Sequence, residues 1–268
     1  MKIYLSFPGR KYDFCITSLN QMPELADLLK ILYGEYCVET PKRALWEIEI
    51  KDKGRNQAFD IIYDDKKFMS DTPVQDVLKI LFKYPNIEPG VIALHGAAVE
   101  HCGKAHVFLA ATKTGKSTLA SYLTSQGLGY ISEDCVLIRK KERCVIPCTI
   151  PVHLREGGKK VLDELGIQYE YSCVHLANVE RYIYCPEKRV ADELPIGAVY
   201  FITRNNLRNE VRRCDKAASF EKLLQAPITV HQVDGEYIRT LLALTENIYD
   251  VMYKDMEYIY RAVCNIDG

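Results

Sequence analysis

The pattern of apolar and polar positions is clearest in the middle of the chain, over residues 107–138. An apolar run is followed there by a polar turn that contains glycine, by a segment with helical spacing at 117–126, and by a second apolar run at 130–138. This order predicts a strand, a loop, a helix and a second strand.

The N-terminal third has the pattern of a small α+β lobe. In chain order we expect a hairpin at 2–7 and 13–17, a helix from Pro23 to Gly34, strands at 44–50 and 58–63, and a helix that follows Thr72. Two prolines and a glycine at 84–90 mark the best boundary in the chain, so the lobe is expected to cover residues 1–88. No group of residues in it suggests chemistry.

The strand that leads into the loop is expected to have an antiparallel neighbour. Residues 91–100 have the pattern of a strand, and a turn at 101–104 connects them to the strand before the loop. The first of these strands carries His95, which this pairing brings close to the loop. A second hairpin is expected from residues 136–140 and 143–146.

The C-terminal part shows less chemistry than the centre. We expect a basic loop at 150–160, a helix at 159–165 and a strand at 196–203. A helix capped by Asp215, with Leu223 and Leu224 inward, should follow. The chain is then expected to form a long helix at 237–251 and a last strand at 256–263. Four cations, Arg155, Lys159, Lys160 and Arg204, are either contacts for phosphate or an acidic substrate or simply solvated side chains.

Composition narrows the class of protein. The 268 residues are 48% hydrophobic and carry a net charge of −1, so a nucleic acid is not an expected partner. Charged residues interrupt the apolar residues at the N-terminus after a few positions, so we expect no signal peptide there. No run of 18 apolar residues is present, and the ten cysteines stand singly. We therefore expect a cytoplasmic protein with reduced thiols, no membrane span and no zinc site.

The loop contains most of a phosphate-binding motif. Gly115, Lys116, Ser117 and Thr118 supply a backbone without a Cβ, a positive charge and a hydroxyl for Mg²⁺. The N–H groups expected to face the phosphates belong to eight consecutive residues: Ala111, Thr112, Lys113, Thr114, Gly115, Lys116, Ser117 and Thr118. Ala110 stands where the motif has its first glycine, and an ordinary strand-to-helix turn remains the alternative.

Two adjacent acids interrupt the apolar run at 130–138. Burying Glu133 and Asp134 in a strand costs several kcal/mol unless a cation compensates, and a Mg²⁺ on phosphates is such a cation. The alternative is a strand end where both acids are solvated. For His95 the alternative is a hydrogen-bonded residue of the core.

The segments HGAAV, GKST and ISEDCVLI together resemble HPr kinase/phosphorylase and related kinases with the phosphoenolpyruvate carboxykinase-type nucleotide fold. The resemblance implies that His95 lies beside the loop and that Lys116 and Ser117 serve phosphate and Mg²⁺. It also implies that Asp134 is a metal ligand and Glu133 the catalytic base.

Four differences limit what the resemblance implies. Ala110 replaces a glycine, and Glu133 stands where an aspartate is usual. The glycine-rich signature of HPr kinase/phosphorylase is not visible after Pro151, so the phosphorylase reaction is not expected. The full carboxykinase is about twice as long, and its activity is not expected either.

The sequence therefore predicts an α/β protein with a mixed sheet, in which a P-loop nucleotide domain at 89–268 follows the N-terminal lobe. It is expected to bind ATP and Mg²⁺ and to pass the γ-phosphate to a hydroxyl, either of serine in a peptide or protein or of a small molecule such as free serine. The alternative is a nucleotide-binding regulatory module without transfer. Whether the chain forms a homo-oligomer is left open.

Overall fold

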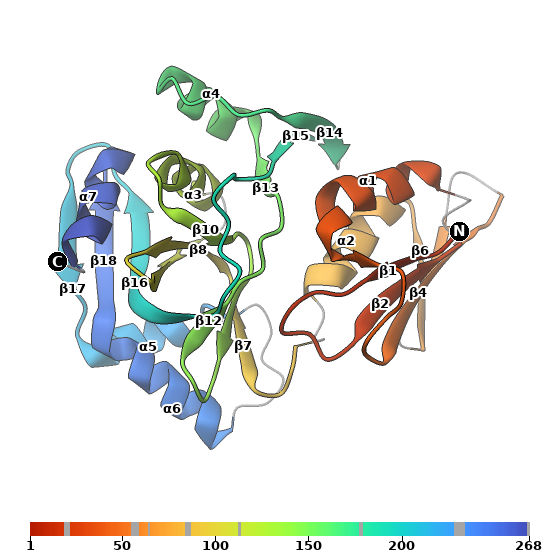
Figure 1. Ribbon diagram of the computed structural model, residues 1–268, viewed down its shortest axis with the longest axis horizontal. Helices are drawn as coiled ribbons and strands as arrows, with labels where there is room; N and C mark the ends of the chain where they lie inside the picture. Colours follow the sequence, from red (N-terminus) through yellow and green to blue (C-terminus); the bar gives the residue numbers. More distant parts are fainter. Residues whose placement is uncertain are drawn as a thin grey trace. The chain divides into compact units, whose positions relative to one another are not determined.

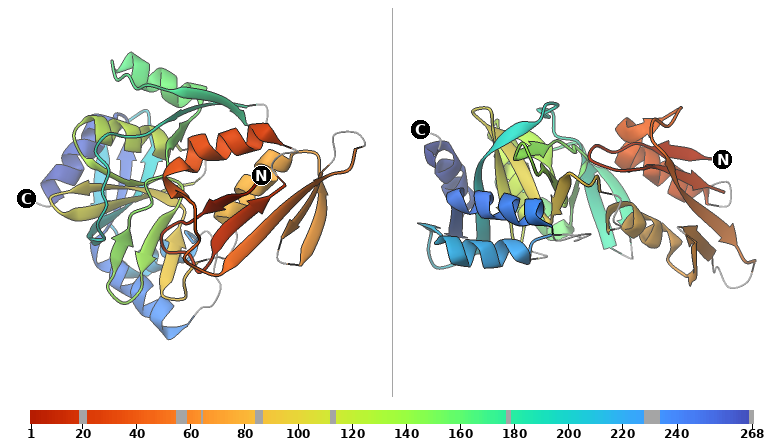
Figure 2. Two further views of the ribbon diagram at one scale, coloured as in Figure 1. Left: turned by 45° about the vertical axis from the view of Figure 1, so that its right-hand side comes forward. Right: turned by 90° about the horizontal axis from the view of Figure 1, so that it is seen from below.

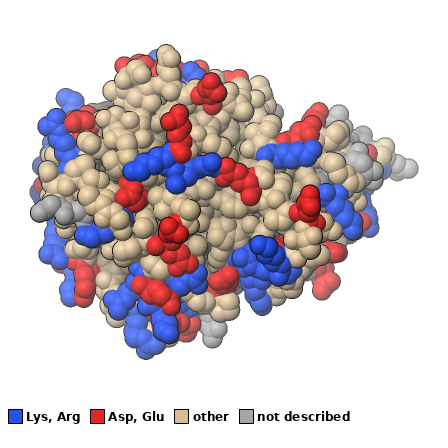
Figure 3. Space-filling model, viewed as in Figure 1, with Lys and Arg blue, Asp and Glu red and all other residues tan. Residues whose placement is uncertain are grey.

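The computed structural model describes residues 1–18, 22–54, 59–63, 65–83, 87–111, 114–176, 179–227 and 234–266. The chain divides into two compact units (Figure 1). The first comprises Met1–Pro89 with Cys173–Arg181, and the second comprises Gly90–Ser172 with Tyr182–Gly268. Among the described helices none is long and apolar enough to cross a membrane. Basic and acidic side chains are interspersed on the face drawn in Figure 3.

The first unit is a six-stranded sheet with two helices (Figure 2). In spatial order its strands are β3 (Cys37–Val38), β1 (Ile3–Leu5), β2 (Asp13–Thr17), β4 (Leu45–Asp52), β5 (Phe59–Tyr63) and β6 (Lys66–Ser70). The helices are α1 (Pro23–Tyr33), which a 3₁₀ turn at Gly34–Tyr36 follows, and α2 (Pro73–Lys83). The predicted hairpin, both helices and both strands are confirmed, within one or two residues at their ends.

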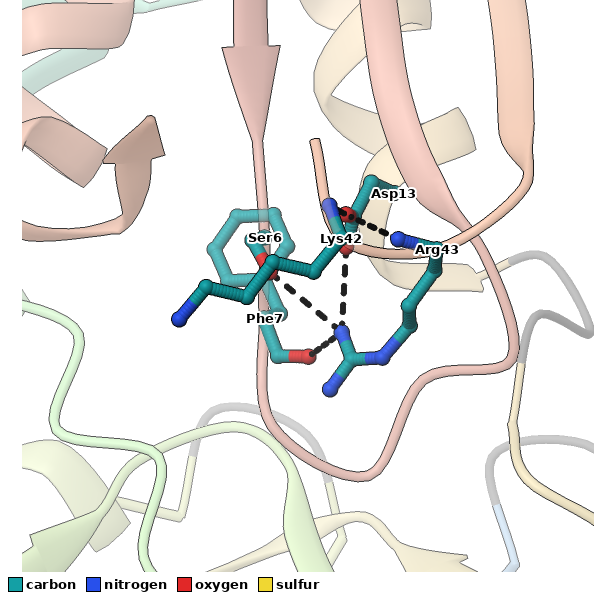
Figure 4. Close-up of polar contacts among 5 residues, drawn as sticks. All are labelled: Ser6, Phe7, Asp13, Lys42 and Arg43. Carbon is teal, nitrogen blue, oxygen red and sulfur yellow. Dashed lines mark hydrogen bonds and ion pairs between the residues drawn. The ribbon is translucent and has the colours of Figure 1, made fainter. Parts of the chain in front are cut away.

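A buried carboxylate ties the first unit together (Figure 4). Asp13 accepts hydrogen bonds from the backbone N–H groups of Lys42 at 2.7 Å and Arg43 at 2.9 Å, and from Arg43 Nη1 at 3.1 Å. Arg43 Nη1 also donates to the carbonyl of Phe7 at 2.8 Å. Burial alone would raise the pKa of Asp13, but these contacts lower it. They fix the start of β4 beside β2, so this cluster has a structural role.

The second unit is built on a nine-stranded mixed sheet. In spatial order seven of its strands are β10 (Gly129–Ser132), β8 (Gly96–His101), β9 (Lys104–Leu109), β16 (Leu194–Arg204), β12 (Cys144–Ile146), β11 (Val136–Arg139) and β7 (Val91–Leu94). The other two lie off this path: β18 (Ile248–Tyr253) pairs with β16, and β17 (Glu210–Arg213) pairs with β18. Strands β9, β16 and β18 are parallel. Because β8 is antiparallel to both β9 and β10, β10 runs in the same direction as well. The C-terminal ends of these four strands therefore meet at one edge, here called the carboxyl edge.

Helices cover both faces of this sheet. Leu119 of α3 (Lys116–Ser125) and Ile259 of α7 (Met256–Ile266) belong to the core on one face. Leu223 of α5 (Lys216–Leu224) and Leu241 of α6 (Gly235–Leu244) belong to the core on the other. The remaining elements are β13 (Val152–Leu154), α4 (Glu156–Glu164), β14 (Ser172–Leu176) and β15 (Val179–Tyr184). β13 pairs antiparallel with residues 182–184 of β15.

Two predicted strands are interrupted at residues that the sequence analysis singles out as site candidates. The strand expected at 91–100 breaks at His95 into β7 and β8, and the strand expected at 130–138 breaks at 133–135 into β10 and β11. At the second break Asp134 has a φ of 60°. The chain turns there because β10 and β11 pair with different neighbours, β8 and β7. The predicted antiparallel pairs β8–β9 and β11–β12 are confirmed.

Four other predictions were wrong. The loop expected at 150–160 is mostly β13 and the start of α4. The helix expected at 237–251 ends at Leu244, and after the 3₁₀ turn Thr245–Asn247 the apolar residues of β18 pair in parallel with β16. Residues 256–263 belong to helix α7, because Ile259 and Val263, four residues apart, bury one stripe. Asp215 does cap α5, but Leu224 is 44% exposed and does not point inward.

Candidate phosphate-binding site

The carboxyl edge gathers the residues that the sequence singled out. The loop at 110–115 follows β9, and the two acids follow β10, two strands away. His95 precedes β8, the strand between them, and lies at the same edge because β8 runs in the opposite direction. Ligands of open α/β sheets bind beyond the carboxyl ends of the strands, so this edge is where a ligand is expected.

The loop joins β9 to α3 through a left-handed glycine. Gly115 has a φ of 90°, a conformation that strains a residue with a side chain, and its carbonyl accepts the first helical bond, from Leu119 N at 2.9 Å. Thr114 Oγ1 donates to the carbonyl of Ala111 at 2.7 Å. Ala110 is not among the described residues with positive φ, so its backbone does not require glycine. Thr112 and Lys113 lie outside the described residues.

Lys116 is a buried cation held by its own loop. Its side chain reaches back to the carbonyls of Ala110 at 3.0 Å and Ala111 at 3.1 Å, and the residue is 7% exposed. Burial lowers the pKa of Lys116, although the charges of Asp134 and Glu133 oppose this. Neutral carbonyls compensate a buried ammonium only in part, so an anion at this position would stabilise the charge.

Ser117 and Glu133 contact each other directly. The hydroxyl of Ser117 donates a hydrogen bond to Glu133 Oε1, and Glu133 Oε2 accepts from the backbone N–H of His153 at 3.2 Å. Glu133 is 2% exposed. Burial, and then the charge of Asp134, raise the pKa of Glu133 to about 8. The sequence predicts Ser117 and Asp134 as the metal ligands, whereas in the structure Ser117 contacts Glu133.

Asp134 occupies a different environment from its neighbour. Its side chain is exposed and its backbone is left-handed, so the two acids no longer alternate across a strand. The carbonyl of Asp134 lies 3.1 Å from Nδ1 of the half-buried His95. His95 is thus next to the turn that carries the acids, and its backbone N–H donates to the carbonyl of Ala226 at 2.9 Å.

The four other cations that the sequence singled out lie at the start of α4, within α4 or at the end of β16. Lys159 pairs with Asp163 at 2.6 Å and lies 5.5 Å from the ring centres of Tyr171 and Tyr182. Lys160 lies 4.0 Å from Glu164. Both lysines therefore interact with neighbouring acidic or aromatic side chains. Arg155 precedes α4 and is exposed. Arg204 ends β16 at the carboxyl edge.

Three features of the site were missed by sequence reasoning. His153 belongs to a segment predicted as a loop, and only the pairing of β13 places its N–H on Glu133. Tyr253 was assigned to no element, yet its hydroxyl donates to the carbonyl of Thr114 at 3.4 Å. Gly158 packs against Thr118, where an added Cβ would lie 2.6 Å from Oγ1. Its place in a Gly-Gly pair was the only signal in the sequence.

The donor set suits a magnesium ion that is also bound by phosphate. Among the described residues no group of three His, Cys, Asp or Glu side chains could hold a metal by itself. Mg²⁺ in nucleotide sites commonly takes one or two protein oxygens and completes its shell with phosphate and water. The Ser117 hydroxyl and the Glu133 carboxylate, in contact beside the loop, are two such oxygens.

Comparisons with known proteins give little beyond this geometry. No family model matches the chain, and no curated protein matches it. A search of solved structures finds the Hpr(Ser) kinase/phosphatase from Coxiella burnetii at 7% identity, covering 65% of this chain and 88% of that one, with a TM-score of 0.32. This is a distant structural relation only.

Proposed function

We propose that this chain is an ATP-dependent kinase that transfers the γ-phosphate to a hydroxyl acceptor. The observation that carries the proposal is the contact between Ser117 and Glu133 beside the buried Lys116, at the start of a helix on the carboxyl edge. A phosphate chain requires a cation and free N–H groups, and its metal requires hard oxygen ligands. Lys116 offers the cation, Ser117 and Glu133 offer the oxygens, and the first turn of α3 offers N–H groups that a helix start leaves without an intrahelical partner.

The loop and the start of α3 supply the groups that would bind ATP, the phosphate donor. The N–H groups of residues 111–118 and the positive end of the α3 dipole would bind the phosphates. Lys116 would exchange its bonds to the loop carbonyls for bonds to the β- and γ-phosphates. Ser117 and Glu133 would hold Mg²⁺, which when bound neutralises part of the phosphate charge. Mg²⁺ binding would displace the proton of Glu133, and the resulting carboxylate would carry the negative charge that favours a metal ligand.

The acceptor side is assigned to Asp134. Its carboxylate is exposed and adjacent to the metal-side acid, so a hydroxyl can approach it. In the transfer the acceptor oxygen forms a bond to the γ-phosphorus, the bond from that phosphorus to the β-phosphate oxygen breaks, and ADP leaves. The acceptor proton passes to Asp134. This exchanges the roles that the resemblance implies for Glu133 and Asp134.

Serine is the acceptor we propose, in a peptide or protein or as the free amino acid. Purified protein is incubated with Mg·ATP and with pools of serine, small hydroxylated metabolites and serine-containing peptides, and products are examined for the mass of one added phosphoryl group. Lys116→Ala is the matched inactive control. Transfer that persists in this variant would show that the loop is not the donor site.

A nucleotide-binding module without transfer is the second candidate. It is favoured by Lys116, whose side chain is already held by carbonyls of its own loop. This candidate requires Mg·ATP to bind while no pool gains phosphate. Transfer to any acceptor excludes it.

A further inference from the structure

Arg204 continues a row of side chains on the face of β16 that packs beneath α3. Successive residues of a strand point to opposite faces. In β16, Tyr200 and Ile202 pack into the core beneath α3, whereas Val199 packs into the opposite core. Arg204 has the parity of Tyr200 and Ile202 and is the last residue of the strand. Its side chain therefore leaves the sheet on the α3 face, at the carboxyl edge.

Its neighbour in the next strand contacts the loop. Arg204 is in register with Tyr253 of β18, which belongs to the same core. The hydroxyl of Tyr253 lies 3.4 Å from the carbonyl of Thr114, and a Cβ on Gly115 would be 3.7 Å from it. Burial raises the pKa of Tyr253, and the charge of Arg204 opposes the shift. Arg204 is thus the strand partner of the residue whose hydroxyl meets the loop.

The charge of Arg204 is available to a ligand. It is exposed, and within the described ranges no carboxylate pairs with it. The next two arginines along the chain differ, since Arg208 and Arg212 both pair with Glu210. A guanidinium beside a loop of this kind suits a phosphate oxygen.

The strand order fixes the direction of a bound nucleotide. Reading across the sheet, the order is β10, β8, β9, β16, β18. Glu133 follows β10, on one side of the loop after β9, and Arg204 ends β16, on the other side. If Ser117 and Glu133 hold the metal, as proposed, the metal-bound end of the phosphate chain would face β10. The nucleoside end would then face β16 and β18.

We infer that Arg204 binds the α-phosphate of the nucleotide, on the side of the loop opposite the two acids. This rests on the proposed function and adds the orientation of its donor. ATP and ADP share the α-phosphate, and Arg204 would touch neither the γ-phosphate nor the acceptor. The contact therefore affects the binding of both nucleotides and leaves the transfer step unchanged.

The test compares Arg204→Gln, Arg204→Lys and the matched control Arg212→Gln. Affinities of the full chain for ATP and ADP with Mg²⁺ are measured by calorimetry, and kcat and KM with any acceptor found. For Arg204→Gln we expect the two affinities to fall equally, by about tenfold or more, with kcat unchanged. Arg204→Lys should recover part of the loss, and Arg212→Gln should equal the wild type. Thermal unfolding of each variant verifies that the fold is retained.

The outcomes separate this inference from the proposed function. Unchanged ATP and ADP affinities in Arg204→Gln, beside a wild type that binds both, would overturn the role of Arg204 alone. A larger loss for ATP than for ADP, with lower kcat, would place Arg204 at the γ-phosphate and reverse the orientation. A wild type that binds neither nucleotide would overturn the proposed function, and this inference with it.

Discussion

The two acids of the site are expected to respond differently to loss of charge. Glu133→Gln keeps the shape of the side chain but removes the carboxylate that contacts Ser117. A neutral amide is a poor ligand for Mg²⁺, so we expect the Mg²⁺-dependent part of ATP affinity to fall by about 10- to 100-fold, or about 1.4–2.8 kcal/mol. Asp134→Asn changes an exposed side chain and should leave this affinity nearly unchanged, while the transfer rate falls by about 10²- to 10⁴-fold.

The assay measures ATP affinity at several Mg²⁺ concentrations and with EDTA, together with single-turnover transfer, for the wild type and both variants. Each variant serves as the matched control for the other, because the residues are adjacent and the substitutions are equivalent. The reverse result would refute the reasoning. If Glu133→Gln binds Mg·ATP normally but does not transfer, Glu133 is the base, as the resemblance implies. If both variants transfer normally, His95 is the next residue to test.

The buried position of Glu133 also predicts how the metal-free chain responds to pH. Its pKa is raised from an ordinary 4.5 to about 8, so between these values the folded chain binds a proton that the unfolded chain releases. The contribution of Glu133 to the free energy of unfolding is therefore greatest below about pH 4.5, and it falls as the pH rises toward about 8. Urea unfolding in EDTA across this range measures the slope. Glu133→Gln should lack this contribution, and identical slopes would contradict it.

Three further substitutions test the surroundings of the loop. Lys116→Ala should lower nucleotide affinity or turnover at least tenfold, about 1.4 kcal/mol, and equal handling of ATP in calorimetry and assay would show that the loop assignment is wrong. Ala110→Gly should leave ATP affinity intact, because glycine reaches every backbone conformation that alanine adopts. Gly158→Ala brings a Cβ to 2.6 Å from Thr118 Oγ1, so in urea unfolding this variant should be less stable than Gly157→Ala, which shares the gain in helix propensity, by about 1 kcal/mol or more. The control Gly157→Ala meets no atom within 4 Å and should not destabilise, and equal effects of the two would contradict the contact.

Local patterns predicted the parts of the fold that depend on neighbours in sequence. The N-terminal hairpin, α1, α3 and the pairing of β8 with β9 follow from spacing, prolines and turn residues. Errors occurred where distant pairing decides the structure. Residues 248–253 continue an amphipathic helical pattern, and they form β18 because β16 offers a buried parallel partner. Residues 256–263 are rich in apolar and aromatic side chains, as strands often are. They form helix α7 instead, and its Ile259 and Val263 pack into the core beneath α3.

The candidate site shows the same division. The motif around Lys116 is continuous in sequence, so its residues could be named in advance. The contact between Ser117 and Glu133 could not be predicted, because it depends on where β10 ends and how the chain turns at Asp134. The N–H of His153 on Glu133 comes from a strand 20 residues away, and no local pattern indicates it.

The two buried charges of the site explain why metal and nucleotide should bind together. Burial lowers the pKa of Lys116 and raises that of Glu133, so each group is pushed toward its neutral form when the site holds no ligand. In the proposed function phosphate would stabilise the charged lysine, and Mg²⁺ would stabilise the charged glutamate. Because Ser117 lies next to Lys116 and contacts Glu133, each ligand would improve the environment of the other. Linkage then requires Mg²⁺ to raise ATP affinity by the same factor as ATP raises Mg²⁺ affinity. Glu133→Gln should reduce that factor, whereas a substitution at Arg204 should lower ATP affinity and leave the factor unchanged.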